Sequence, residues 1–161
     1  MTHARRLFSL LVMAVCFAPN VVQAQDADNL IQVQTQKSAI QVSQDIEAAA
    51  KRHGYGVLAK RNMTKTLASK GLSIKETVMI FDLCSPQHAK KAIDETVAVA
   101  TVLPCSIAVW ERDGRTTMAM VKPTRLLGLV SPSKEMGQIA QQVEEELHLL
   151  MKEVAKSRKT K

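Results

Sequence analysis

Two cysteines and one histidine are the side chains of this sequence best suited to binding or redox chemistry. Cys84 directly precedes Ser85-Pro86, and His88 follows it with Cys-x3-His spacing. Serine caps helices and proline suits the first helical position, so Cys84 is predicted to stand at a helix start, where backbone N–H groups and the helix dipole favour a thiolate. Cys105 begins a later apolar segment. Cys84, His88 and Cys105 are therefore the candidate ligand-binding or redox residues.

Three states of the two thiols are compatible with the sequence. A disulfide requires Cα atoms within about 7 Å, whereas a simple strand-helix-strand crossover would separate Cys84 from Cys105 by about 17 Å or more. The apolar connector 97–103 could instead bring the chain back. The second state is a metal or cofactor site using Cys84, His88 and Cys105, although a Cys-x3-His pair lacks the second ligand cluster of a zinc motif. The third is a pair of inert, half-buried thiols.

A β-hairpin is the best-defined element of the sequence. Asp113-Gly114 between two apolar segments is a typical two-residue hairpin turn. Such a turn places Val109 opposite Met118 and Ile107 opposite Met120. Most of this face is expected in the core, where methionine fills gaps.

Sulfur side chains on the hairpin extend the set of candidate metal ligands. Met120 and Cys105 share one face of the predicted ladder, and thioether and thiolate groups favour soft ions. Cys84, His88, Cys105 and Met120 are therefore the candidate ligands of a copper(I)-like ion, and no other cofactor is predicted.

The other face of the hairpin is also apolar. By alternation it carries Ala108, Trp110, Ala119 and Val121. Two apolar faces imply that a helix covers one face and that a second layer or a partner covers the other. Trp110 is therefore either a dimer contact or an ordinary core residue.

Missing patterns disfavour several activities. The sequence has no P-loop, no complete dinucleotide-binding glycine pattern and no Ser–His–carboxylate set, so an enzymatic role is not predicted. Aromatic residues make up only 3% of the chain, too few for a base-stacking platform, and nucleic acid is not an expected partner. The acidic run 144–146 is interpreted as a solvated helix face, and His88 taken alone as a surface residue at a helix start.

The first 24 residues have the pattern of a cleaved secretory signal peptide. Arg5 and Arg6 precede the apolar run 7–18, and a small-x-small cleavage pattern ends at Ala24. Removal of these 24 of 161 residues, which include two arginines and no acid, leaves 137 residues with a net charge of +5 and two cysteines. No second stretch is long enough to cross a bilayer. A periplasmic or secreted location is therefore predicted, in a compartment where disulfides form.

The remaining residues 25–161 are predicted to form a single α+β domain. Periodicity and turn residues predict five strands, four helices and one hairpin. We expect a two-layer sandwich in which helices pack on a mixed or antiparallel sheet of about five strands, followed by a C-terminal helix. The expected strands are 30–35, 56–60, 77–83, 106–112 and 115–121, and the expected helices begin near 38 or 43, 62, 85 and 133, the last extending to 157. Spacing places Ala89, Ala92, Ile93 and Thr96 on the inner face of the helix that begins at 85.

Three segments together are similar to one known family. These are Phe81-Asp82-Leu83-Cys84-Ser85-Pro86-Gln87-His88-Ala89, then Leu103-Pro104-Cys105-Ser106-Ile107-Ala108-Val109-Trp110-Glu111, and the turn Asp113-Gly114. They resemble the domain of unknown function family 302, with a family-like core over residues 33–130. The family often has Asn where this chain has Ser85, and Asp where this chain has Lys122 before Pro123, so a role of that acid has no counterpart here.

The resemblance implies a compact α+β domain, often dimeric, without a settled activity. We therefore expect an exported, homodimeric binding or accessory domain whose small-molecule ligand lies near Cys84, His88 and Cys105. The alternative hypothesis is a thiol-redox or soft-metal-handling protein that uses the two cysteines.

Overall fold

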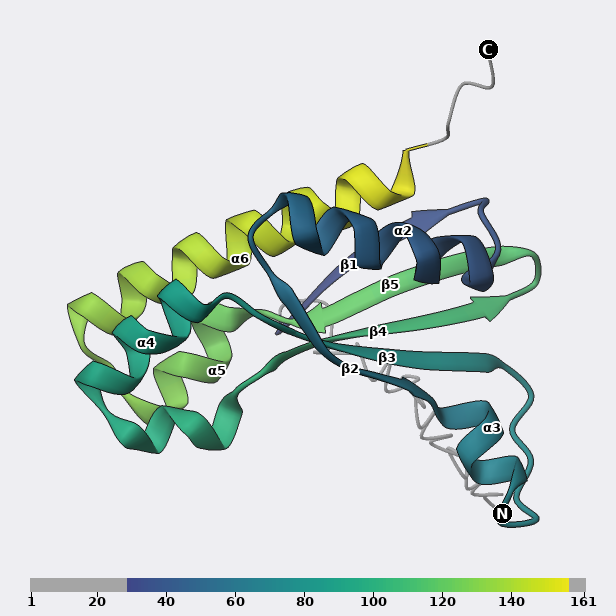
Figure 1. Cartoon of the computed structure of the whole chain (residues 1–161), viewed down its shortest axis with the longest axis horizontal. Helices are drawn as coiled ribbons and strands as arrows, with labels where there is room; N and C mark the ends of the chain where they lie inside the picture. The colour runs from purple at the N-terminus through teal and green to yellow at the C-terminus, as the bar shows by residue number, and fades with distance from the viewer. Residues whose placement is uncertain (1–28, 157–161) are drawn as a thin grey trace, which may run out of the picture.

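A five-stranded antiparallel sheet organises the computed structural model, which describes residues 29–156. The strands lie in the order β1-β5-β4-β3-β2, so the first two strands in the sequence form the two edges (Figure 1). The strands are β1 (Leu30–Thr35), β2 (Gly56–Asn62), β3 (Thr77–Cys84), β4 (Cys105–Arg112) and β5 (Arg115–Val121). The helices are α2 (Ala39–Arg52), α3 (Met63–Ala68), α4 (Pro86–Glu95), the 3-10 helix η1 (Val97–Val102), α5 (Pro123–Val130) and α6 (Lys134–Ala155). The predicted α+β class with a C-terminal helix is confirmed, and every strand pair in this sheet is antiparallel.

The hairpin has the register that the sequence predicts. Val109 lies opposite Met118, and Asp113 and Gly114 both have positive φ angles, of 51° and 71°. Two positive φ angles define the type I′ turn that matches the twist of the flanking strands. This turn therefore determines which face of β4 and β5 enters the core.

The connection from β3 to β4 returns the chain antiparallel. Because α4 and η1 together reverse its direction, Leu83 at the end of β3 pairs with Cys105 at the start of β4. The Leu103–Pro104 peptide bond just before β4 is cis. Cys84 and Cys105 therefore lie at the same end of the sheet, and the wide separation considered for a simple crossover does not occur.

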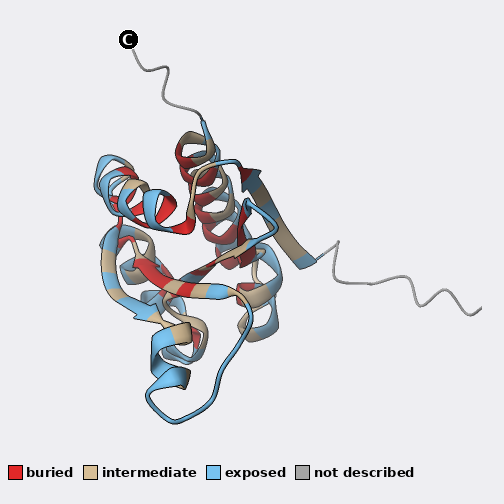
Figure 2. Cartoon of the chain, turned by 90° about the vertical axis from the view of Figure 1, so that its right-hand side faces the viewer, coloured by how far each residue is buried: buried red, intermediate tan, exposed pale blue. Residues whose placement is uncertain are grey.

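Helices α2 and α6 lie side by side over one face of the sheet (Figure 1). Apolar residues at helical spacing form one buried side of α6, and Figure 2 shows buried segments concentrated along α2, α6 and the central strands. Helix α3 contributes no buried residue. The buried residues of α6 are Met136, Ile139, Ala140, Val143, Leu147, Leu150, Met151 and Val154.

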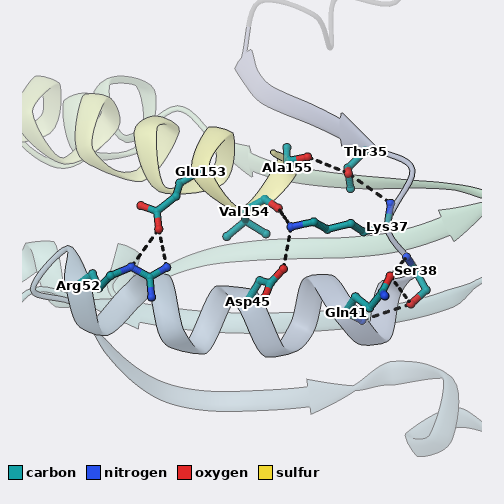
Figure 3. A network of polar contacts seen from close by, with 9 residues as sticks. All are labelled: Thr35, Lys37, Ser38, Gln41, Asp45, Arg52, Glu153, Val154 and Ala155. Carbon is teal, nitrogen blue, oxygen red and sulfur yellow. Dashed lines mark hydrogen bonds and ion pairs between the residues drawn. The ribbon is translucent and has the colours of Figure 1, made fainter. Parts of the chain in front are cut away.

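Polar contacts fasten the C-terminal end of α6 to the segment around the start of α2 (Figure 3). Lys37 Nζ lies 2.6 Å from the carbonyl oxygen of Val154 and 2.8 Å from Asp45 Oδ2. Thr35 donates its hydroxyl to the carbonyl of Ala155 at 3.0 Å. These contacts satisfy carbonyl groups that a helix end leaves without intrahelical partners.

Three local expectations are corrected by the structure. Residues 123–130 form α5, a helix that the sequence analysis did not predict, and the apolar connector 97–103 is largely the 3-10 helix η1. Ile93, placed on the inner face of α4 by its spacing, is 40% exposed, and Ala92 is the buried residue of that helix. Ser85 is the N-cap residue of α4, but its side chain makes no capping hydrogen bond.

The predicted signal peptide lies outside the described residues. Within residues 29–156, none of the helices combines the length and the apolar character needed to span a membrane.

Candidate functional site

The three candidate residues line one small hollow at the end of the sheet. Cys84 comes from the end of β3, His88 from the first turn of α4 and Cys105 from the start of β4. The hollow is partly open and has a volume of about 20 Å³, enough for roughly one water molecule. The rest of its lining is mainly apolar: Leu83, Ala89, Ala92, Leu103, Leu127, Ile139 and Val143, with Tyr55 and Ser85. It therefore offers a few polar groups in an apolar setting, as ligand sites do.

Both cysteines carry free thiols, but their exposure differs. Cys84 is half-buried, whereas Cys105 is only 7% exposed. Burial raises the pKa of Cys84, and burial together with the charge of Cys84 raises the pKa of Cys105 to about 11. Desolvation therefore outweighs the thiolate-stabilising effect expected at the start of α4. Both groups rest as neutral thiols near neutral pH.

His88 is held by a carboxylate from α6. Its Nε2 atom lies 3.0 and 3.2 Å from the two carboxylate oxygens of Glu146. A carboxylate only accepts hydrogen bonds, so Nε2 carries a proton, and in the neutral form of the ring Nδ1 is then an acceptor. Nδ1 is buried and has no hydrogen-bond partner among the described residues. Glu146 thus fixes the orientation of the imidazole through Nε2, whereas the hydrogen-bonding capacity of Nδ1 is not used by the described residues.

Tyr55 completes this hydrogen-bonded group. Its hydroxyl donates to Glu146 Oε2 at 2.8 Å. Burial, followed by the hydrogen bond and charge of Glu146, raises the pKa of Tyr55 well above its ordinary value, so the hydroxyl keeps its proton. The position of Tyr55 follows from the end of α2, where Gly54 has φ +76° and Tyr55 N–H donates to the carbonyl of Ala50 at 2.8 Å. This is the Schellman arrangement that glycine permits.

Tyr55 and Glu146 are site residues that were not predicted from the sequence. Glu146 belongs to the acidic run interpreted as a solvated face, and its side chain is indeed 41% exposed, yet it binds both Tyr55 and His88. His88, taken alone as a surface residue, has a side chain only 15% exposed. The one available signal was spacing, because Glu146 directly precedes Leu147 of the apolar stripe of α6.

Met120 lies apart from this hollow. It is buried in the core, opposite Ile31 of β1, and is not among the residues that line the hollow. Among residues 29–156, no three His, Cys, Asp or Glu side chains are grouped so that they could hold a metal ion. The structure thus brings together Cys84, His88 and Cys105 but not Met120.

The fold and this hollow define a small α+β domain with helices on one face of a single antiparallel sheet. The sequence profile described as "Domain of unknown function DUF302" matches residues 31–154, including the C-terminal helix. The chain therefore belongs to the DUF302 family.

A solved structure supports the same assignment. The chain is similar to an uncharacterized conserved DUF302 protein from Bacillus stearothermophilus, with a TM-score of 0.74 and 28% sequence identity. The match covers 79% of this chain and 98% of the other. A comparison with curated proteins finds no match.

The buried Cys105 thiol predicts a specific loss of stability at high pH. Its pKa is about 11 in the folded state and 9.0 for an ordinary thiol, so the folded protein favours the neutral form. This contribution is fully present below pH 9 and is lost as the pH rises through 11. The free energy of unfolding should fall by about 2 to 3 kcal/mol more in the wild type than in Cys105→Ala over that range.

Urea unfolding at about pH 8 and about pH 11 measures this difference. Cys84→Ala serves as the matched control, because the less buried Cys84 should change the pH dependence less. Equal declines in the wild type and Cys105→Ala would contradict the prediction.

Proposed function

We propose that the protein is an exported binding or accessory domain that holds a small molecule in the hollow beside Cys84, His88 and Cys105. The observation that carries this proposal is the buried Nδ1 atom of His88, which has no hydrogen-bond partner within residues 29–156 although Nε2 is bound by Glu146. A buried acceptor without a partner costs about 1 to 3 kcal/mol. A ligand that donates one hydrogen bond to Nδ1 recovers part of this cost.

The lining of the hollow limits the chemistry of such a ligand. Most lining side chains are aliphatic, and the free volume of about 20 Å³ holds roughly one water-sized group before the ligand must extend through the opening. The ligand is therefore a small, largely apolar group with one N–H or O–H donor. Acetamide, which combines a methyl group with an amide donor, is a suitable probe.

Nitrogen NMR of histidine-labelled protein tests this binding. Acetamide should shift the Nδ1 resonance of His88 in a saturable manner and leave His148 unchanged, because His148 does not line the hollow. His88→Phe should abolish the response, whereas the control variant His148→Gln should preserve it. A response of His88 that only grows linearly with acetamide concentration, or an equal response of both histidines, counts against the proposal.

The proposed location and assembly rest on separate observations. Export follows from the signal-peptide pattern of residues 1–24. Association of two copies is supported by the sheet face opposite α2 and α6, where Ile80, Ala108 and Ala119 form one cross-strand row beside Trp110. Apolar side chains gathered on a central sheet face favour a partner there.

Light scattering after gel filtration tests the homodimer. The wild type should have twice the mass of one chain, and Trp110→Arg should yield monomers because it places a charge within the proposed interface. Leu129→Arg is the matched control, since Leu129 is exposed and belongs to helix α5 and not to the sheet. A monomeric wild type refutes the dimer.

The second candidate function is thiol-redox or soft-metal handling. It is favoured by one observation, that Cys84 and Cys105 are both free and line the same hollow. In the redox case, the two thiols lose two protons and two electrons to a disulfide oxidant and become a disulfide. In the metal case, Cys84 and Cys105 lose their protons and hold a copper(I) ion as a pair of thiolates.

Thiol counting and copper titration test this second function. Protein purified from the exported fraction without reductant should lack free thiols or should bind one copper(I) ion that competes with a chromophoric chelator. Cys84→Ser should remove either property, whereas Met120→Leu should not, because Met120 lies away from the hollow. Two alkylatable thiols together with no uptake of copper(I) would exclude it.

A further inference from the structure

We propose that residues 63–76, which comprise helix α3 and the loop after it, bind the protein to an anionic lipid surface. The lysines of this segment, called the α3 arm, contact the headgroup phosphates, and Leu72 and Ile74 enter the boundary of the acyl chains. The proposal is independent of the ligand site, because no residue of the α3 arm lines the hollow.

The net charge of the chain is concentrated in one stretch that contains most of the α3 arm. Residues 48–75 include seven lysines and arginines and neither aspartate nor glutamate. The whole chain has 22 basic and 15 acidic residues, so the residues outside this stretch carry 15 of each sign and are neutral overall. The excess positive charge therefore belongs to this stretch, an asymmetry that favours binding to an anionic surface.

The lysines of the α3 arm are available for such a contact. The two basic residues that precede the arm in β2 are paired with carboxylates from α2 and β3. By contrast, Lys65, Lys70 and Lys75 are exposed, and none of them forms an ion pair within residues 29–156. Their charge is therefore not neutralised by the protein itself.

Two aliphatic side chains lie exposed among these lysines. Leu72 is 58% exposed and Ile74 is 37% exposed, within a run of eight consecutive exposed residues, 68–75. Figure 1 shows the α3 arm extending away from the ends of β2 and β3, and Figure 2 shows its loop as exposed. Aliphatic side chains among lysines at the end of a projection suit a membrane interface, where leucine enters the acyl boundary and lysine stays at the phosphates.

The base of the α3 arm is fixed, so its tip is presented in one orientation. At the start of α3, Asn62 Oδ1 accepts a hydrogen bond from the N–H group of Lys65 at 2.9 Å. Thr64 Oγ1 donates to the carbonyl of Glu76 at 3.1 Å and accepts from the N–H group of Val78 at 2.8 Å, which joins the two ends of the arm. A preorganised surface loses less conformational entropy on binding.

An anionic lipid surface fits this composition better than a nucleic acid or an acidic protein. Base stacking uses aromatic side chains and bidentate phosphate recognition uses arginine, and residues 63–76 contain neither. Lysine is depleted at protein–protein interfaces, whereas near an anionic membrane each lysine adds to the attraction. The lysines and the aliphatic tip are therefore explained together by lipid.

Binding through the α3 arm leaves the hollow away from the lipid. Strand β3 runs from Thr77, next to the arm, to Cys84, which lines the hollow. At about 3.3 Å per residue, these two positions are about 23 Å apart. A bound domain therefore presents the hollow to the aqueous side.

Vesicle flotation tests the proposal on exported protein whose intact mass corresponds to residues 25–161. Vesicles of phosphatidylglycerol and phosphatidylcholine in equal parts should bind the protein, and vesicles of phosphatidylcholine alone should bind it far more weakly. Added salt should weaken the binding, because it screens the lysines. No binding to the anionic vesicles, or equal binding to both kinds, overturns the proposal.

Charge variants locate the contact on the α3 arm. Lys70→Gln combined with Lys75→Gln should weaken binding to the anionic vesicles about 30-fold, since each lysine near the surface contributes about fivefold. Lys91→Gln combined with Lys134→Gln is the matched control, because it removes the same charge from α4 and α6. An equal loss in this control shows that net charge and not the arm is recognised, which refutes the proposal.

Variants of Leu72 test insertion into the lipid. Leu72→Ser should weaken binding about 10-fold, whereas Leu129→Ser, which changes an exposed leucine of α5, should not. Leu72→Trp should bind, and its added fluorescence should be quenched by lipids with brominated acyl chains. Unquenched fluorescence of the added tryptophan in the bound protein contradicts insertion.

Two controls complete the test. Circular dichroism first confirms that each variant is folded, as expected for changes at exposed side chains. Retention of the wild type on a DNA oligonucleotide or an acidic polypeptide, without binding to anionic vesicles, overturns the assignment to lipid. Acetamide binding is measured separately at His88, so failure of the vesicle experiment leaves the proposed ligand site unaffected.

Discussion

The packing of α6 along the molecule is the constraint on which both the fold and the site depend. Its 22 residues span about 33 Å, and its buried side packs against α2, α4, α5 and β1. Burial of Val143 and Leu147 fixes the rotation of the helix, and this rotation directs Glu146 toward His88 and Tyr55. The apolar core therefore determines the orientation of an imidazole that the sequence places 58 residues away from its carboxylate.

The elements predicted from the sequence are those with strong local patterns. Asp113-Gly114 requires two positive φ angles, so the turn type and the register of β4 and β5 followed directly. The apolar stripe of α6 was equally clear because its residues recur over about five turns. Helix α5 was missed because Lys122 precedes it where a capping side chain would have marked its start, whereas Asn62 marks the start of the shorter α3. Ile93 was placed on the wrong side of α4 because it directly follows Ala92, the buried residue of that helix.

Only part of the candidate site could be predicted from the sequence, because local patterns do not show which distant residues meet. Cys84, His88 and Cys105 could be predicted from their residue types and from their positions near a helix start and a strand start. These three residues lie close together because β4 runs antiparallel to β3, and a local sequence pattern does not give this direction. Tyr55 and Glu146 join them only through tertiary packing, so no spacing in the sequence could have paired them with His88. The thiol pKa values were likewise set by desolvation, a property of the assembled structure.

The position of Trp110 has a practical consequence for spectroscopy. It is the sole tryptophan of the chain and lies on the sheet face opposite the core, while the hollow is lined by residues of the other layer and of the sheet end. The fluorescence of Trp110 will therefore report association on that face, whereas the NMR resonances of the His88 imidazole will report binding in the hollow. Fluorescence and NMR can therefore measure association and ligand occupancy separately in a single sample.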